Sequence, residues 1–176
     1  MPRLVRYNVA ASLDGCIADA TGGYDWIPAD ETIDFAALFA KVDTLLFGRV
    51  SWELVASLPP EQRPWRDGAR LVVFSRTLAS VPDGVTLVRD DAAGAVAALR
   101  AEPGDGDIWL FGGGQLFGAL LAAGQVDRVE VSVVPVLLGG GIPLVPPGVP
   151  RTALELVDLA RYPSGIVTLS YRVRTR

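Results

Sequence analysis

Apolar and polar side chains alternate along residues 3–11, and this period of two predicts a β-strand near the start of the chain. The apolar side of that strand carries Val5, Tyr7, Val9 and Ala11. Residues 69–75 lack polar alternation, which is typical of a strand covered on both faces. Apolar runs bounded by turn residues predict this strand and others at 43–48, 84–88, 107–111 and 127–137.

Apolar residues at helical spacing separate these strands. Residues 28–42 begin with Pro28 and several acidic residues, which favour a helix start. The i, i+3, i+4, i+7 pattern that follows predicts a buried helix face made of Phe35, Leu38, Phe39 and Val42. Further helices are expected at 49–58, 90–102 and 115–124.

The end of the chain has a different pattern. Residues 153–161 and 165–176 read as two strands joined by the turn sequence YPSG, and the second alternates between apolar and polar side chains. This predicts an antiparallel hairpin with one solvated face. Because strands and helices alternate up to the hairpin, we expect an α/β fold with a mixed sheet flanked by helices, in a single domain over residues 1–176.

Composition limits where the protein can act. Half of the 176 residues are hydrophobic, yet no apolar run approaches the roughly 18–20 residues that a membrane span needs. No signal-peptide pattern follows Met1, and Cys16 is the single cysteine, so we expect a cytoplasmic protein. A net charge of −4 without any cluster of basic residues argues against a nucleic-acid surface.

The sequence contains no histidine. This excludes Ser-His-Asp and Cys-His nucleophiles, histidine acid–base catalysis and ordinary catalytic zinc sites, so no metal site is expected. A P-loop sequence is also absent. The chemistry must therefore use carboxylates, hydroxyls, arginines, backbone amides or a cofactor.

Three consecutive glycines, Gly112 to Gly114, stand between a predicted strand and a predicted helix. Bare backbone at such a turn lets amides approach a phosphate at the positive end of the helix. The dinucleotide pattern GxGxxG is incomplete, because Phe117 stands in place of its third glycine. Glycines that only permit close packing of helix on strand are an equally good explanation of the turn alone.

Two other strand ends carry polar residues. Gly48, Arg49 and Ser51 lie at the end of the predicted strand 43–48 and directly after it. The predicted strand 69–75 ends in the same way, with Ser75, Arg76 and Thr77. Ligands of open α/β sheets bind beyond the carboxyl ends of strands, so the three segments together predict a site for a phosphorylated nucleotide. Taken separately, each arginine is more typical of a solvated surface residue.

The segments around these strand ends resemble segments of known protein families. "LLFGRVSWE" (45–53), "VVFSRTL" (72–78) and "WLFGGGQLF" (109–117) resemble the corresponding segments of dihydrofolate reductases. "AASLDGCIAD" (10–19) and "VVPVLLGGGIPL" (133–144) are more similar to the reductase domain of the riboflavin-pathway deaminase/reductase. The chain is identified as a stand-alone member of the dihydrofolate reductase-like superfamily, and this implies its three-layer α/β fold.

The resemblance implies NADPH as the cofactor. It places Arg49, Ser51, Ser75, Arg76 and Thr77, with the turn at Gly48, around the 2′-phosphate and neighbouring oxygens. It assigns the pyrophosphate to Gly112, Gly113, Gly114, Gln115, Leu116 and Phe117. Ala11 and the "DGCIA" segment would line the nicotinamide pocket. Trp26 matches a tryptophan near the cofactor, although a loop anchor that buries apolar area is an equal interpretation.

Without histidine, a proton for the acceptor must come from a carboxylate, a hydroxyl or water. "WIPADETIDF" (26–35) resembles the segment that holds the acid of dihydrofolate reductases, which makes Asp30 a candidate. Counting back from the Gly-Arg pair makes Asp34 an equal candidate. The alternative is that both complement the dipole at a helix start.

The resemblance thus predicts an NADPH-dependent reductase that transfers hydride to a pteridine- or pyrimidine-like heterocycle. One alternative is the pathway enzyme that reduces 5-amino-6-(5-phosphoribosylamino)uracil. Two departures count against it: Phe111 stands where that family carries a glutamate, and "SWELVASLPPEQR" replaces its substrate-binding run. A non-catalytic NADPH-binding protein, or a structural protein whose glycines only pack, is also compatible with the motifs.

We also expect a homodimer, because related reductase domains pair. The long apolar run "VEVSVVPVLLGGGIPLV" (129–145) is a candidate association surface. The alternative is that this run is a central strand of its own sheet.

Overall fold

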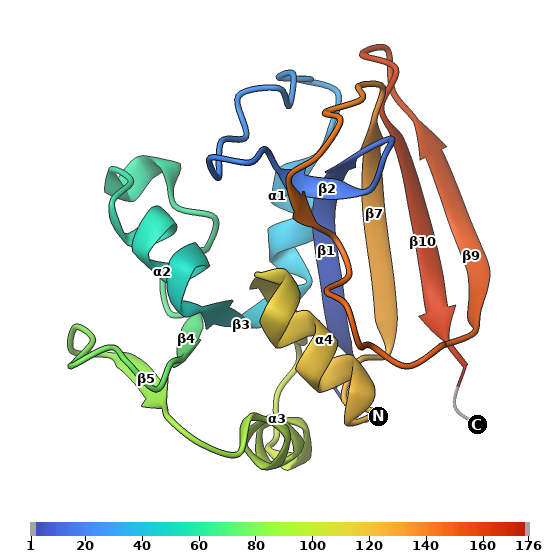
Figure 1. The fold of residues 1–176 in the computed structure, drawn as a ribbon. Coiled ribbons are helices and arrows are strands. Elements are labelled where there is room, and N and C mark those ends of the chain that lie inside the picture. The colour runs from blue at the N-terminus through green and yellow to red at the C-terminus, as the bar shows by residue number, and fades with distance from the viewer. Residues whose placement is uncertain (1–2, 175–176) are drawn as a thin grey trace.

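The computed structural model describes residues 3–174 and contains an eight-stranded sheet (Figure 1). Across the sheet the strands are β5 (Val85–Val88), β4 (Arg70–Phe74), β3 (Val42–Gly48), β6 (Asp107–Gly112), β1 (Val5–Ser12), β7 (Arg128–Val134), β10 (Val167–Val173) and β9 (Leu154–Arg161). The strands from β5 to β7 are mutually parallel, and β10 runs antiparallel to both of its neighbours. The predicted mixed sheet and the predicted hairpin are therefore confirmed.

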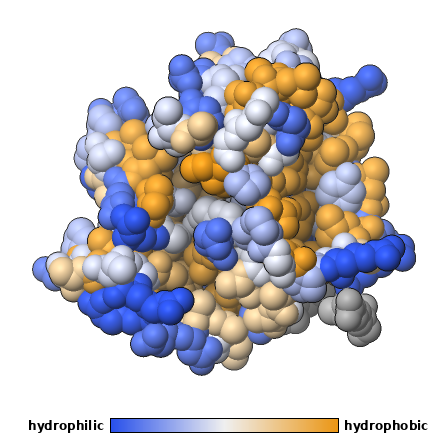
Figure 2. Space-filling view, in the orientation of Figure 1, coloured by the Kyte–Doolittle hydropathy of each residue, from blue (hydrophilic) through white to orange (hydrophobic). Residues whose placement is uncertain are grey.

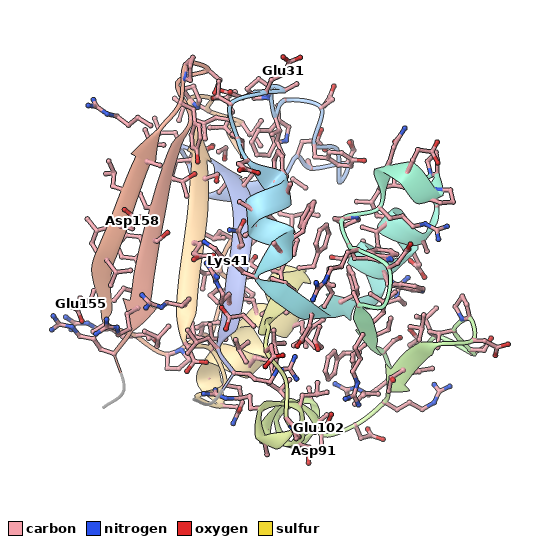
Figure 3. The ribbon with its side chains drawn as sticks, turned by 180° about the vertical axis from the view of Figure 1, so that it is seen from behind. Glu31, Lys41, Asp91, Glu102, Glu155 and Asp158 are labelled. Carbon is pink, nitrogen blue, oxygen red and sulfur yellow. The ribbon has the colours of Figure 1, made fainter. Side chains whose placement is uncertain are left out.

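Helices cover both faces of the sheet. They are α1 (Phe35–Ala40), α2 (Arg49–Ala56), α3 (Ala92–Ala101) and α4 (Gly114–Ala122), with a 3-10 turn, η1 (Pro60–Gln62). Leu46 of β3 packs in one apolar cluster with Phe117 of α4, whereas its neighbour Phe47 packs in a second cluster with Trp52 of α2. Because successive strand residues point to opposite faces, α3 and α4 cover one face and α1 and α2 the other. We call these the front and the back, seen in Figures 1 and 3 respectively.

The predicted helix over residues 28–42 is wrong at both ends. The Asp30 carboxylate accepts hydrogen bonds from Thr32 and from the amide of Ser164, so the segment before α1 turns instead of coiling. Asp34 then accepts from the Ala37 amide and caps α1. At the other end Val42 belongs to β3, where it pairs with Asp107. The helix shrinks to six residues, and Phe35 at its start is 52% exposed instead of buried.

The apolar run at 129–145 divides into three parts. Its first part is β7, which lies between β1 and β10 inside the sheet. The run then turns and forms β8 (Ile142–Pro143), which pairs with β2 (Cys16–Ala18) in a small second sheet that the sequence pattern did not reveal. The alternative interpretation, a central strand of its own sheet, therefore holds for β7. Within residues 3–174 no helix is long and apolar enough to cross a membrane.

Candidate functional site

The three polar segments singled out in the sequence follow neighbouring strands. Gly48, the last residue of β3, pairs with Phe74 of β4, and Phe47 pairs with Gly112 of β6. Because β4, β3 and β6 are parallel, their carboxyl ends share one edge of the sheet. The structure therefore brings the Gly-Arg turn, the Ser-Arg-Thr turn and the glycine triplet together.

The helices that leave β3 and β6 cover opposite faces. Helix α2 follows β3 on the back and leads to β4, whereas α4 follows β6 on the front and leads towards β7 on the other side (Figure 1). Neighbouring strands whose connections diverge in this way define a topological switch point, where open α/β sheets bind ligands. The candidate site is the crevice between the starts of α2 and α4.

Both helices begin without a side-chain cap. The residues before them are Gly48 and Gly113, which have no side-chain oxygen to accept first-turn amides. The other two α-helices are capped by Asp34 and Asp91, whose carboxylates accept hydrogen bonds of 2.8 and 2.9 Å from first-turn amides. Uncapped first-turn amides at the positive end of a helix favour an anion. Two such helix starts meet at this crevice.

The glycines have two different roles. A Cβ atom added to Gly112 would lie 3.0 Å from the Ser51 Oγ, and one on Gly48 would lie 3.5 Å from the Gly113 nitrogen. A side chain at Gly112 would therefore displace Ser51 from the crevice. By contrast, a Cβ atom on Gly114 would lie 3.0 Å from the carbonyl oxygen of Pro143. Gly114 permits helix packing, whereas Gly112 and Gly113 border the crevice.

The basic side chains at the crevice are accessible. Arg49 is exposed and donates to both carboxylate oxygens of Glu53, one helical turn later, at 2.9 and 2.7 Å. An exposed pair of this kind stabilises a helix by only about 0.3–0.5 kcal/mol, so a phosphate can replace Glu53 at small cost. Arg76 and Thr77 are also exposed, whereas the Ser75 hydroxyl is buried and accepts from the Thr77 amide.

The other cofactor candidates contribute through backbone or packing. Gln115 is exposed, but the side chains of Leu116 and Phe117 are buried in the front core. The Phe117 amide donates to the Gly113 carbonyl at 3.1 Å, so of these two residues only Leu116 can offer its backbone amide to a ligand. Ala11 is buried at the end of β1. Trp26 is half-buried in the loop before α1, and its indole N–H donates to the Gly23 carbonyl at 3.1 Å. That contact is the one expected of a loop anchor.

The two candidate acids differ in how their oxygens are used. Hydrogen bonds from Ser164 and Thr32 hold the pKa of Asp30 well below its usual range, which is opposite to the shift that favours a proton donor at neutral pH. Asp30 thereby ties the segment before α1 to the β9–β10 turn. Asp34 uses one oxygen to cap α1, and its second oxygen accepts no hydrogen bond within residues 3–174.

A third carboxylate, Asp14, joins two loops beside the end of β1. It accepts hydrogen bonds from the Ser12 hydroxyl at 2.6 Å and from the amides of Leu138 and Gly139 at 3.1 and 2.8 Å. These donors lower its pKa. The contact of Asp14 with Leu138 and Gly139 spans more than 120 positions in the chain, so it has no local signal in the sequence.

Lowering the pH should break the hydrogen bonds that Asp14 accepts from Leu138 and Gly139. Because the folded-state pKa of Asp14 is lowered, its contribution to stability is complete above the unfolded value, near pH 4, and is lost as the pH falls further. We expect the amide exchange of Leu138 and Gly139 to be constant from neutral pH to about pH 5, once corrected for intrinsic exchange, and to quicken below about pH 4. NMR-detected hydrogen exchange measures this, and Asp14→Ala should show the fast exchange at every pH.

Aromatic side chains line the back of the sheet next to the glycine turn. Phe111, which directly precedes Gly112, lies with its ring centroid 5.1 Å from that of Trp109 and 5.2 Å from that of Phe47. Phe39 of α1 stacks on Trp109 at 5.5 Å. The back of the sheet between α1 and α2 therefore carries a packed layer of apolar, aromatic side chains.

The sheet order, together with the crevice between two helices that begin directly after a glycine, defines a dihydrofolate reductase-like α/β protein. The chain belongs to the RibD C-terminal domain family, which matches residues 3–168. The resemblance inferred from the motifs, to the C-terminal domain of the riboflavin-pathway protein, is therefore confirmed.

Individual relatives cover nearly the whole chain. The uncharacterized protein YyaP of Bacillus subtilis (strain 168) is 32% identical over 178 residues, which cover 96% of this chain and 94% of YyaP. The crystal structure of a protein named for riboflavin biosynthesis from Shewanella sp. PV-4 has a TM-score of 0.81 at 28% identity and covers 99% of this chain and 100% of that one.

A more distant structure shares the fold alone. It is the Thermotoga maritima diaminohydroxyphosphoribosylaminopyrimidine deaminase/5-amino-6-(5-phosphoribosylamino)uracil reductase, which has a TM-score of 0.73 at 18% identity. The match covers 98% of this chain and 57% of the Thermotoga chain.

Proposed function

We propose that this protein is an NADPH-dependent reductase that transfers hydride to a planar heterocycle of the pteridine or pyrimidine type. The observation that carries the proposal is the meeting of two uncapped helix starts, at Gly48 and Gly113, on neighbouring strands of the switch point. Membership of the RibD C-terminal domain family supports the same class of reaction.

The residues at the crevice fit a dinucleotide with a 2′-phosphate. Amides at the start of α4 would hold the pyrophosphate, and Gly113, which is half-buried, has no Cβ atom to cover them. Exposed Arg49 and Arg76, from neighbouring strand ends, would hold the 2′-phosphate. Bound NADPH would supply the hydride.

The aromatic layer beside the glycine turn favours a flat acceptor. Phe111, which is half-buried and packs on buried Trp109, brings no charge to this region, so the region suits an uncharged heterocycle better than a ribosyl phosphate. The second candidate, 5-amino-6-(5-phosphoribosylamino)uracil, is supported by the full-length likeness to the Shewanella protein named for riboflavin biosynthesis. A screen of both compound classes separates the candidates.

The first test is a parallel titration of the purified protein with NADPH and NADH, followed by tryptophan fluorescence. Trp52, Trp65 and Trp109 all belong to the aromatic cluster on the back of the sheet, so the signal reports on the region next to the crevice. We expect clear preference for NADPH. If neither nucleotide binds, the glycines serve packing only and the proposal fails. NADPH binding without turnover of any acceptor would identify a non-catalytic binding protein.

Of the two candidate acids, we propose that Asp34 delivers the proton, directly or through water. Asp34→Asn should lower turnover about tenfold, which is less than the roughly hundredfold or more typical of a general acid, because water reaches this exposed position and replaces the carboxyl group in part. Asparagine still caps a helix, so α1 and the NADPH affinity should be preserved. Asp30→Asn is the matched control and should change turnover less than about twofold. The reverse order of effects, in steady-state kinetics, would assign the role to Asp30.

A further inference from the structure

Helix α2 carries its two charged side chains in the order that its dipole disfavours. Arg49 is its first residue, at the positive end, and Glu53 lies in the last turn, at the negative end. Helix α3 shows the favourable order, with the carboxylate of Asp91 at its start and Arg100 in its last turn. The stability of α2 therefore does not explain where its two charges stand.

The start of α2 concentrates positive charge. Gly48 provides no side-chain cap for the first-turn amides, and the guanidinium of Arg49 adds a full charge beside them. Arg76 follows the neighbouring strand, because Phe74 of β4 pairs with Gly48 of β3. Figure 2 shows hydrophilic side chains on both sides of the hollow between α2 and α4, at the centre of the view. An anion is the ligand that such a place favours.

The anion that Arg49 contacts in the structure is Glu53. One terminal nitrogen, Nη1, donates to both carboxylate oxygens, at 2.9 and 2.7 Å. Within residues 3–174 the other two nitrogens of the guanidinium donate no hydrogen bond. The two side chains are 45% and 47% exposed, so the contact can open without a loss of packing.

This contact directs Arg49 away from the crevice. Glu53 lies one helical turn, about 5.4 Å, further along α2 from the strand ends. A phosphate held by both Arg49 and Arg76 would lie at the strand ends, so the guanidinium must turn back to reach it. The carboxylate also repels a phosphate, which carries about two negative charges. Glu53 thus opposes the 2′-phosphate in two ways.

We propose that Glu53 is a specificity-determining residue: it competes with the 2′-phosphate of the cofactor for Arg49, and so lowers the preference for NADPH over NADH. This inference rests on the NADPH-dependent reductase function proposed above. When the phosphate takes over the guanidinium, Glu53 turns to solvent, which its exposure permits. NADH lacks the 2′-phosphate and leaves the pair closed.

The opposite role, in which Glu53 orients Arg49 for the phosphate, predicts the opposite effect. An orienting carboxylate would hold the guanidinium towards the strand ends, whereas Glu53 holds it along the helix. Replacing Glu53 with glutamine separates the two roles. Glutamine keeps an oxygen that accepts from Arg49 but loses the charge. A competitor is weakened by this change, and NADPH then binds more tightly.

Parallel titrations of the whole chain with NADPH and NADH test the proposal. Glu53→Gln should bind NADPH about three- to fivefold more tightly than the unmodified protein, which is the effect of one unit charge at close range in water. NADH binding should change less than about twofold, because the charge has no 2′-phosphate to repel. The gain for NADPH should shrink as the salt concentration rises.

The matched control is Glu102→Gln. Glu102 forms an ion pair with Arg70, and the two side chains are 46% and 44% exposed, almost as in the Arg49–Glu53 pair. Arg70 begins β4, so this pair lies at the opposite edge of the sheet from the crevice (Figure 3). Glu102→Gln removes the same charge from the chain and should change neither affinity by more than about twofold.

The outcomes separate this inference from the reductase proposal. If the unmodified protein prefers NADPH but Glu53→Gln binds it equally or more weakly, the role of Glu53 is wrong and the reductase proposal stands. An equal gain for NADPH and NADH would also overturn the role of Glu53, because it would reflect net charge alone. If the unmodified protein binds no NADPH, the reductase proposal fails and the role of Glu53 fails with it.

NMR follows the contact directly. The carboxylate carbon of Glu53, observed by carbon-detected NMR of the labelled protein, should shift when NADPH is added and should not shift with NADH. The carboxylate carbon of Glu102 should be insensitive to both nucleotides. A Glu53 signal that stays unchanged at saturating NADPH would show that the pair with Arg49 persists, and would overturn the proposal.

Discussion

Arg76→Ala is expected to weaken NADPH binding ten- to hundredfold while changing NADH binding less than about twofold. The two nucleotides differ only in the 2′-phosphate, and a charge-assisted hydrogen bond to such a group contributes about 1.5–3 kcal/mol. Arg76 is exposed at the end of β4, next to the Gly-Arg turn of β3, so solvent replaces its side chain without a packing loss. Parallel fluorescence titrations of both nucleotides measure the difference.

The control for Arg76→Ala must remove the same charge elsewhere. Arg151 is an exposed arginine on the segment before β9, and Arg151→Ala should leave both affinities unchanged apart from a small effect of net charge. Raising the salt concentration should reduce the NADPH preference of the unmodified protein, because phosphate contacts are screened. Equal weakening of NADPH and NADH by Arg76→Ala would contradict the assignment of the 2′-phosphate site.

Phe117→Ala is expected to lower the free energy of unfolding by about 3–5 kcal/mol, as large aromatic truncations in cores do. The Phe117 side chain is almost completely buried, and its ring stacks on Tyr7 with centroids 3.9 Å apart. The truncation therefore opens a cavity between α4 and β1. Urea unfolding followed by circular dichroism measures the loss.

This substitution also separates two roles for Phe117. Its ring is buried and its amide donates to the Gly113 carbonyl, so the earlier amides at the start of α4 are the ones left for phosphate, and the folded variant should keep its NADPH affinity within about threefold. Phe117→Leu retains most of the apolar volume and should be clearly more stable than Phe117→Ala. A small stability loss combined with a large loss of NADPH affinity would place the ring in the cofactor site.

Much of the candidate site could be predicted from the sequence because its signals are local. Gly48 and Gly113 precede helices and carry no capping oxygen, and this property can be read from neighbouring positions. Asp30 was harder to interpret, because the partner that ties down its carboxylate, Ser164, lies 134 positions away in the chain.

The sequence by itself determined which side of each strand is apolar, where helices follow strands, and which residues end those strands. Alternation is a property of adjacent residues, so it specifies a face without specifying the neighbour or the extent of the layer above it. Only the tertiary structure placed β3 beside β6, which joins two uncapped helix starts into one crevice. It also decided that the helices stop short of β9, so that Leu156 and Leu159 meet water, because coverage depends on how distant segments pack.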